Sequence, residues 1–124
     1  MEKVNIDRAM ADIRVFWQPR IAGELNGQYI KLAKLKGEFI MHHHECEDEM
    51  FLVIKGTLIL EFADRAETLN AGEFLIIPKG VPHRPVAENE VEVMLFEPAS
   101  TRNTGNIENE LTISTLKRLT AKEK

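Results

Sequence analysis

The chain has a single cysteine, Cys46, among its 124 residues, so it cannot form an internal disulfide bond. It also lacks long apolar runs. The longest, residues 50–54 and 74–77, are far shorter than the roughly 20 residues that a membrane-spanning helix needs. Residues 1–5 contain no apolar core of a signal peptide. We therefore expect a cytoplasmic protein with no membrane partner.

The chain also has fewer basic residues than acidic ones. There are 16 Lys and Arg residues against 20 Asp and Glu, which gives a formal net charge of −4. No basic stripe is present that could neutralise the phosphates of a duplex, so nucleic acid is excluded as a partner. With 44% hydrophobic and 29% charged residues, the composition is that of a globular protein, and its length predicts one domain over residues 1–124.

Short strand-like runs separated by glycine and proline predict an all-β fold. We expect strands over residues 15–21, 29–36, 39–44, 50–55, 57–62, 67–69, 74–77, 83–87 and 91–96. Strands of this length and spacing are typical of a jelly roll or small barrel, and an immunoglobulin-like sandwich is the alternative. The predicted barrel covers about residues 15–97.

The two ends of the chain lie outside this barrel. Residues 6–15 are compatible with one or two turns of helix, and residues 98–124 form a polar tail in which residues 111–121 could be helical. Several strands are apolar on both faces, which requires a second cover for the outer face. Since the terminal segments are short and largely polar, we expect a homodimer to cover five outward-facing residues. These are Met50, Leu52, Ile54, Met94 and Phe96.

All four histidines fall in two clusters, at residues 42–44 and at residue 83. Side chains of an extended strand alternate between its faces, so His42 and His44 point to the same side. Shortly after His44, Glu49 begins the next predicted strand, where its carboxylate can return beside the two imidazoles. His83 can add a fourth ligand from across a closed sheet. The spacing therefore predicts a site for one divalent transition metal. The ligand types alone do not decide whether this metal is Mn, Fe, Co, Ni, Cu or Zn.

The same alternation separates neighbouring residues from this site. His43 is expected on the outside, and Arg84, which follows His83, also faces outward. Cys46 lies in an acidic loop that would raise the pKa of a thiol, so we interpret it as an unreactive free cysteine.

The inner wall of the site follows from the register of two strands. Phe51 and Val53 share the face of Glu49, and Ile40 shares the face of His42, so these three apolar residues are expected to line a substrate pocket.

Two segments of the chain resemble the paired motifs of the cupin superfamily. The first contains Gly37, His42, His44, Glu49 and Gly56. The second contains Gly72, Pro78, Gly80 and His83. The chain departs from the common pattern by one residue fewer after Gly37 and by Ala87 in place of an asparagine. Nearly the whole chain is similar to small bacterial cupin-2 proteins, some of them described as mannose-6-phosphate-isomerase-like. The resemblance implies a conical double-sheet barrel that holds a divalent metal towards one end.

Four protein ligands leave coordination positions open, and a centre with a formal charge of +1 attracts an anionic or polyhydroxylated small molecule. One hypothesis is an enzyme that catalyses isomerisation, epimerisation or dioxygenation. Its general base would have to come from pocket residues such as Gln28, Tyr29 or Lys31. The alternative is a non-catalytic, metal-dependent protein that binds or senses a small molecule, and a storage role is a third.

Overall fold

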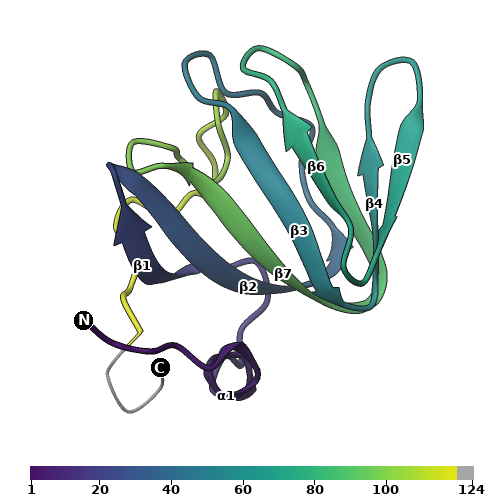
Figure 1. The fold of residues 1–124 in the computed structure, drawn as a ribbon. Helices are drawn as coiled ribbons and strands as arrows, with labels where there is room; N and C mark the ends of the chain where they lie inside the picture. The colour runs from purple at the N-terminus through teal and green to yellow at the C-terminus, as the bar shows by residue number, and fades with distance from the viewer. Residues whose placement is uncertain (120–124) are drawn as a thin grey trace.

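The structure is a computed structural model that describes residues 1–119. In this part of the chain there are one helix and seven strands (Figure 1). They are α1 (Ile6–Ala11), β1 (Arg20–Leu25), β2 (Gln28–Glu38), β3 (Glu49–Lys55), β4 (Thr57–Glu61), β5 (Ala66–Asn70), β6 (Phe74–Ile77) and β7 (Arg84–Pro98). The all-β prediction is confirmed.

Strand β7 is the centre of the sheet because it is long enough to pair with three other strands. Near its end, Met94 pairs with Leu32 of β2 and with Leu52 of β3. Near its start, Val86 pairs with Ile59 of β4. The strand order is β1-β2-β7-β3-β6, with β4 on β7 and β5 on β4, and all these pairs are antiparallel. The sheet curls, with β1 and β2 on one side and β4 and β5 on the other, as expected for a jelly-roll barrel (Figure 1).

Alternating burial along the strands places the core inside this curl. In β3, Phe51 and Val53 are buried, whereas Leu52 and Ile54 between and after them are half-buried. The inner cluster is made of apolar residues from β2 to β7, namely Ala33, Leu35, Phe51, Val53, Leu58, Leu60, Leu69, Ile77, Ala87, Val91, Val93 and Leu95. The inward register that the sequence predicts for β3 is therefore the observed one.

The N-terminal helix covers part of the outer face. Asn5 caps α1 by accepting a backbone N–H through its side chain at 2.9 Å. Behind the cap, the buried Met10 packs in a second cluster with Leu32, and Ile54 and Met94 lie against this cluster. Two of the five residues that we expect a dimer to cover are thus covered, at least in part, by the chain itself.

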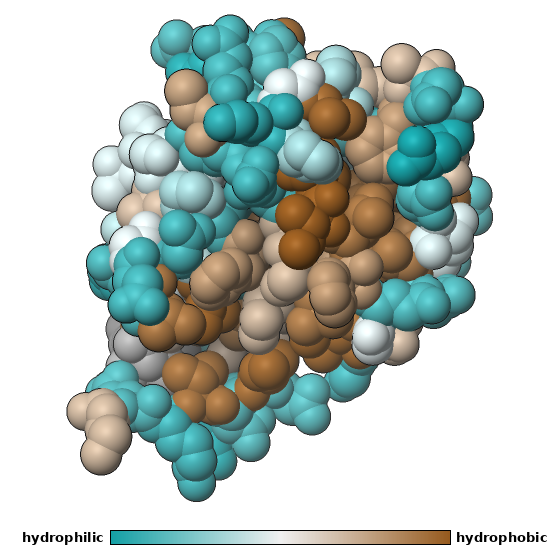
Figure 2. Space-filling model, turned by 45° about the horizontal axis from the view of Figure 1, so that its top comes forward, coloured by the Kyte–Doolittle hydropathy of each residue, from teal (hydrophilic) through white to brown (hydrophobic). Residues whose placement is uncertain are grey.

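The rest of the outer face is apolar and open. Phe74 and Ile76 of β6 are 59% and 56% exposed. They pair with Leu52 and Met50 of β3, and Met50 also pairs with Phe96 of β7. Figure 2 shows apolar side chains gathered in a broad area across one face of the molecule. Apolar side chains of β3, β6 and β7 thus remain at the surface of the described chain.

The strand expected over residues 39–44 is wrong. The chain there is irregular, with a single bridge between His42 and His83. The segment opposite contains Pro82 and Pro85, and proline has no backbone N–H to donate to a regular ladder. The two predicted strands over residues 83–87 and 91–96 are one strand, β7.

The expected helix forms at the N-terminal end but not at the other end of the described chain. Helix α1, Ile6–Ala11, is the one or two turns that the sequence predicts within residues 6–15. The helix expected over residues 111–121 does not form between residues 111 and 119, and its last two residues lie outside the described part of the chain. The backbone of this segment instead bonds to β1: Ile21 donates to Lys117 O and accepts from Leu119 N, both at 3.0 Å.

Candidate metal centre

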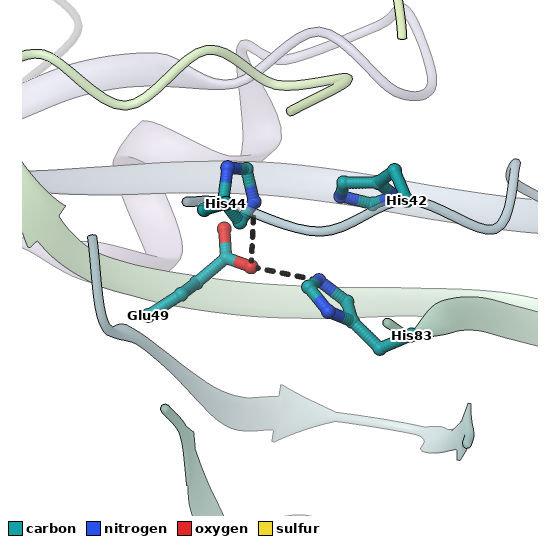
Figure 3. Close-up of side chains that lie close together, drawn as sticks. All are labelled: His42, His44, Glu49 and His83. Carbon is teal, nitrogen blue, oxygen red and sulfur yellow. Dashed lines mark hydrogen bonds and ion pairs between the residues drawn. The ribbon is translucent and has the colours of Figure 1, made fainter. Parts of the chain in front are cut away.

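Three separate segments bring four side chains together inside one end of the barrel. His42 and His44 lie in the loop after β2, Glu49 is the first residue of β3, and His83 immediately precedes β7. Reciprocal backbone hydrogen bonds join His42 and His83 at 3.0 and 2.8 Å. All four side chains are buried, and their potential ligand atoms lie within 4.8 Å of one another (Figure 3).

Hydrogen bonds to the backbone determine which ring nitrogens face the centre. Nδ1 of His42 donates to the carbonyl oxygen of Ile40, and Nδ1 of His83 donates to that of Val81, both at 2.9 Å. A carbonyl oxygen only accepts, so Nδ1 carries the hydrogen in both rings. Burial lowers the pKa of His42 to about 4, which keeps its imidazole neutral near pH 7. The Nε2 lone pair is then free to bind a metal.

The centre holds more acceptors than donors. Oε1 of Glu49 lies 3.1 Å from Nε2 of His83 and 3.4 Å from Nε2 of His44 (Figure 3). Neither ring nitrogen of the buried His44 has a hydrogen-bond partner among the described residues. Leaving such buried polar atoms unpaired costs about 1–3 kcal/mol each. A cation between the Nε2 atoms and the carboxylate would relieve this crowding, so the cluster could hold a metal ion.

A second carboxyl group, Glu97 of β7, lies directly beside the first. Burial alone would raise the pKa of Glu49, but its close contacts with Glu97, His44 and His83 outweigh this effect and hold the pKa well below its usual range. Burial and the neighbouring Glu49 raise the pKa of Glu97, and the ammonium of Lys31 offsets only part of this rise.

A small cavity of about 40 Å³ adjoins the cluster. Its wall is mostly apolar, with Trp17, Pro19, Leu35, Phe39, Phe51, Pro85, Val93 and Leu95, and it also includes His42, Glu49, Glu97 and Asn103. The rings of Trp17 and Phe39 are stacked with centroids 4.9 Å apart, and Phe39 meets the edge of His42 at 5.5 Å. An aromatic pair thus separates the cluster from solvent on this side.

The three predicted pocket residues have different positions. Phe51 lines the cavity. Val53 is fully buried in the core further along β3, and Ile40 is half-buried; neither is among the cavity-lining residues. Ile40 acts on the site through its backbone, by orienting His42. From this loop, Phe39 contributes its side chain to the cavity wall together with His42, because residues 39–44 do not form the regular strand that the alternation assumed.

Other sequence candidates lie at the edge of the site or away from it. His43 is partly exposed, with Nε2 3.8 Å from the Glu45 carboxylate. Cys46 is an exposed free cysteine. Arg84 bonds to Glu61 through its guanidinium, with Nε 2.8 Å from Oε1.

The tail folds back over the histidine loop. Asn106 accepts the backbone N–H of His43 at 2.9 Å and donates its own N–H to His43 O at 3.0 Å. Gly105 lies so close that a β-carbon there would clash with His43 O. The polar tail therefore packs directly on the segment that supplies two of the four clustered side chains.

Sequence reasoning missed Glu97 and Trp17 as parts of the site. Glu97 follows an apolar strand and looks like the start of the polar tail. The only sequence signal for its role is the register, since it lies on the inward face with Val93 and Leu95. Trp17 reaches the cavity from a turn with a positive φ of 63°, which no local pattern indicated.

Comparison with known proteins agrees with this fold and cluster. Residues 29–97 match the family model described as a cupin domain, and the chain belongs to the cupin family. No helix in the described residues is long and apolar enough to cross a membrane.

Solved structures of similar proteins include two with substantial identity. One is a cupin-2 domain containing protein from Shewanella frigidimarina, 42% identical, with 77% of this chain and 93% of that chain covered and a TM-score of 0.76. The other is protein NMB1881 from Neisseria meningitidis, 33% identical, with coverages of 79% and 100% and a TM-score of 0.72. The uncharacterised protein YdbB of Bacillus subtilis is 42% identical over 62 residues, 49% of this chain and 55% of YdbB. This match spans about half of the curated relative's length.

Proposed function

We propose that this cupin binds one divalent transition metal through His42, His44, Glu49 and His83, and uses the ion to bind a small organic anion in the adjoining cavity. The observation that carries the proposal is the convergence of four acceptor side chains within 4.8 Å, where neither ring nitrogen of His44 has a hydrogen-bond partner in the described part of the chain. Three neutral imidazoles and one carboxylate suit Mn, Fe, Co, Ni, Cu or Zn.

Such an ion, when bound, supplies Lewis-acid polarisation of a ligand oxygen, or oxygen activation if it is iron. The chain's own residues orient and shield it. The carbonyls of Ile40 and Val81 fix two imidazoles, and the stacked Trp17 and Phe39 exclude water from one side of the cavity. One carboxylate against a divalent ion leaves a formal charge of +1, which attracts an anionic oxygen.

The composition of the cavity wall favours a small organic acid over a sugar as the ligand. The amide of Asn103 in this wall is already bonded to Leu111 O and Ile113 N, at 2.8 and 2.9 Å. The indole N–H of Trp17 donates to Lys36 O at 2.8 Å. The wall thus offers few free hydrogen-bonding groups for the hydroxyls of a sugar. A cavity of about 40 Å³ also limits the ligand to a few heavy atoms. We infer a small carboxylate or enolate with an apolar body.

The site offers little for proton transfer by side chains. Lys31 is buried in an ion pair with Glu97, and Gln28 and Tyr29 are absent from the cavity-lining residues of the described chain. Metal-dependent binding without turnover is therefore the alternative to an isomerase, epimerase or dioxygenase. Turnover of a bound acid by the metal-loaded protein would establish an enzyme, and its unchanged recovery after binding would favour the binding protein.

The test uses Trp17, the chain's only tryptophan, which lies in the cavity wall. Protein prepared without a nickel column is stripped of metal, and its fluorescence is followed on titration with Co²⁺, Ni²⁺ or Zn²⁺. Small carboxylates and sugars are then added in turn. We expect saturable metal binding, followed by a response to carboxylates that needs the metal. Absence of any metal response, together with absence of metal in the purified protein, would contradict the proposal.

We also propose that the chain forms a homodimer through its outer sheet face. The support is the apolar area that α1 leaves open, including Met50, Leu52, Phe74, Ile76 and Phe96. Burying a large apolar side chain contributes about 1.5–3 kcal/mol, so covering this area in a two-fold interface is strongly favourable.

A further inference from the structure

In the described part of the chain, Lys31 and Glu97 form the one fully buried ion pair without a histidine. Lys31 Nζ lies 2.7 Å from Glu97 Oε1, and each side chain is 2% exposed. The other Lys or Arg pairs have side-chain exposures from 34% to 83%. Burying two charges has a large desolvation cost, and an apolar pair of similar volume is often as stable. A contribution to folding stability therefore does not explain why these two charged side chains are buried together.

The pair has a specific place beside the histidine cluster. Lys31 is on β2, Glu97 on β7 and Glu49 on β3, three neighbouring strands of the sheet. Glu97 is bonded to Lys31 through Oε1, and the pairing of β7 with β3 places it beside Glu49, with which it lines the same cavity. Glu49 in turn directs Oε1 between His44 and His83 (Figure 3). A continuous series of polar contacts thus connects the lysine to the metal cluster.

Glu49 needs such a support. Its side chain has several rotatable bonds, and a ligand carboxylate must keep one orientation to bind a metal with the three imidazoles. His42 and His83 are each fixed by a backbone carbonyl. Apart from the histidines, Glu97 is the ionisable side chain beside Glu49 in the cavity wall, and its Oε2 atom has no hydrogen-bond partner among the described residues. Partners of this kind typically change metal affinity by about 10–100-fold when removed.

We propose that Glu97, held by Lys31, positions the Glu49 carboxylate and thereby sets the affinity and coordination geometry of the metal centre. This inference rests on the proposed metal-binding function. It makes Lys31 and Glu97 positioning residues, and neither has to touch the metal or the ligand.

The test compares Co²⁺ binding by the wild type with that of E97M, E97Q, K31M/E97M and the control R65M/E67Q. Competition with a chelator gives the affinity, the visible absorption spectrum of Co²⁺ reports the coordination geometry, and thermal unfolding reports stability. The side-chain amide of the E97Q variant can still accept from Lys31 and donate to Glu49. The double variant removes both charges, so it avoids a buried unpaired lysine. Arg65 and Glu67 form an exposed pair with a 2.9 Å contact, away from the cluster.

We expect E97M and K31M/E97M to bind Co²⁺ about 10–100-fold more weakly with a changed spectrum, and E97Q to restore both. The double variant should regain thermal stability over E97M without regaining affinity. Wild-type affinity and spectrum in K31M/E97M would overturn the inference, as would an equal change in R65M/E67Q. If the wild type itself fails to bind Co²⁺, both the proposed function and this inference are wrong.

Discussion

Acidification of the metal-free protein should remove a defined part of its stability through His42. This imidazole is 4% exposed, and burial lowers its pKa from 6.5 to about 4. Between these two values the unfolded chain binds a proton at His42 that the folded protein does not bind. The stability that His42 contributes is therefore complete above pH 6.5 and is lost as the pH falls towards 4. Each pKa unit corresponds to about 1.4 kcal/mol, so the loss reaches about 3 kcal/mol at pH 4.

The assay is urea unfolding of EDTA-treated wild type and H42N at pH 7 and at pH 4. Other groups also titrate in this range, but most of their contribution is common to both proteins and cancels in the difference. The amide that replaces the imidazole in H42N does not titrate, so the free energy of unfolding of the wild type should fall by about 3 kcal/mol more than that of the variant. An equal fall in the two proteins would refute the assignment of His42 as a buried neutral imidazole.

Two further predictions concern the tail and the outer face. G105A should lower the melting temperature more than G72A. Both glycines have a positive φ, of 56° and 86°, but a β-carbon at Gly105 would clash with His43 O, whereas one at Gly72 would meet nothing within 4 Å. Equal shifts in calorimetry would contradict the close packing of the tail on the histidine loop. Light scattering should give twice 14.2 kDa for the wild type and 14.2 kDa for F74K/I76K. A monomeric wild type would reject the dimer.

Local pattern was sufficient for most of the fold. Alternation along β3 and β7 gave the correct inward faces because every second residue of these strands is buried, and the turn residues Gly56 and Gly72 separate the strands as observed. It failed over residues 39–44, where alternation was assumed for a segment whose opposite chain is interrupted by prolines. The predicted C-terminal helix failed because its backbone groups find partners in β1, a long-range contact that no local sequence pattern reveals.

In the site, too, contacts between residues close in sequence could be predicted, whereas contacts between distant residues could not. The spacing of His42, His44 and Glu49 predicted that these side chains converge, because all three depend on one loop and the start of one strand. Lys31 and Glu97 could not be placed, since their pairing depends on the register between β2 and β7, which lie 66 residues apart at this contact. A buried ion pair becomes visible only once that register is known.

Metal content is the most direct test of the central claim. Wild type, H44A, E49A and H43A are produced without a nickel column and examined by elemental analysis after extensive dialysis, with circular dichroism to establish that each is folded. We expect about one transition-metal ion per chain in the wild type and in H43A, and a sharp loss in H44A and E49A, because His43 lies outside the cluster whereas His44 and Glu49 form it. A folded wild type without metal, or a loss in H43A as large as in H44A, would contradict the account.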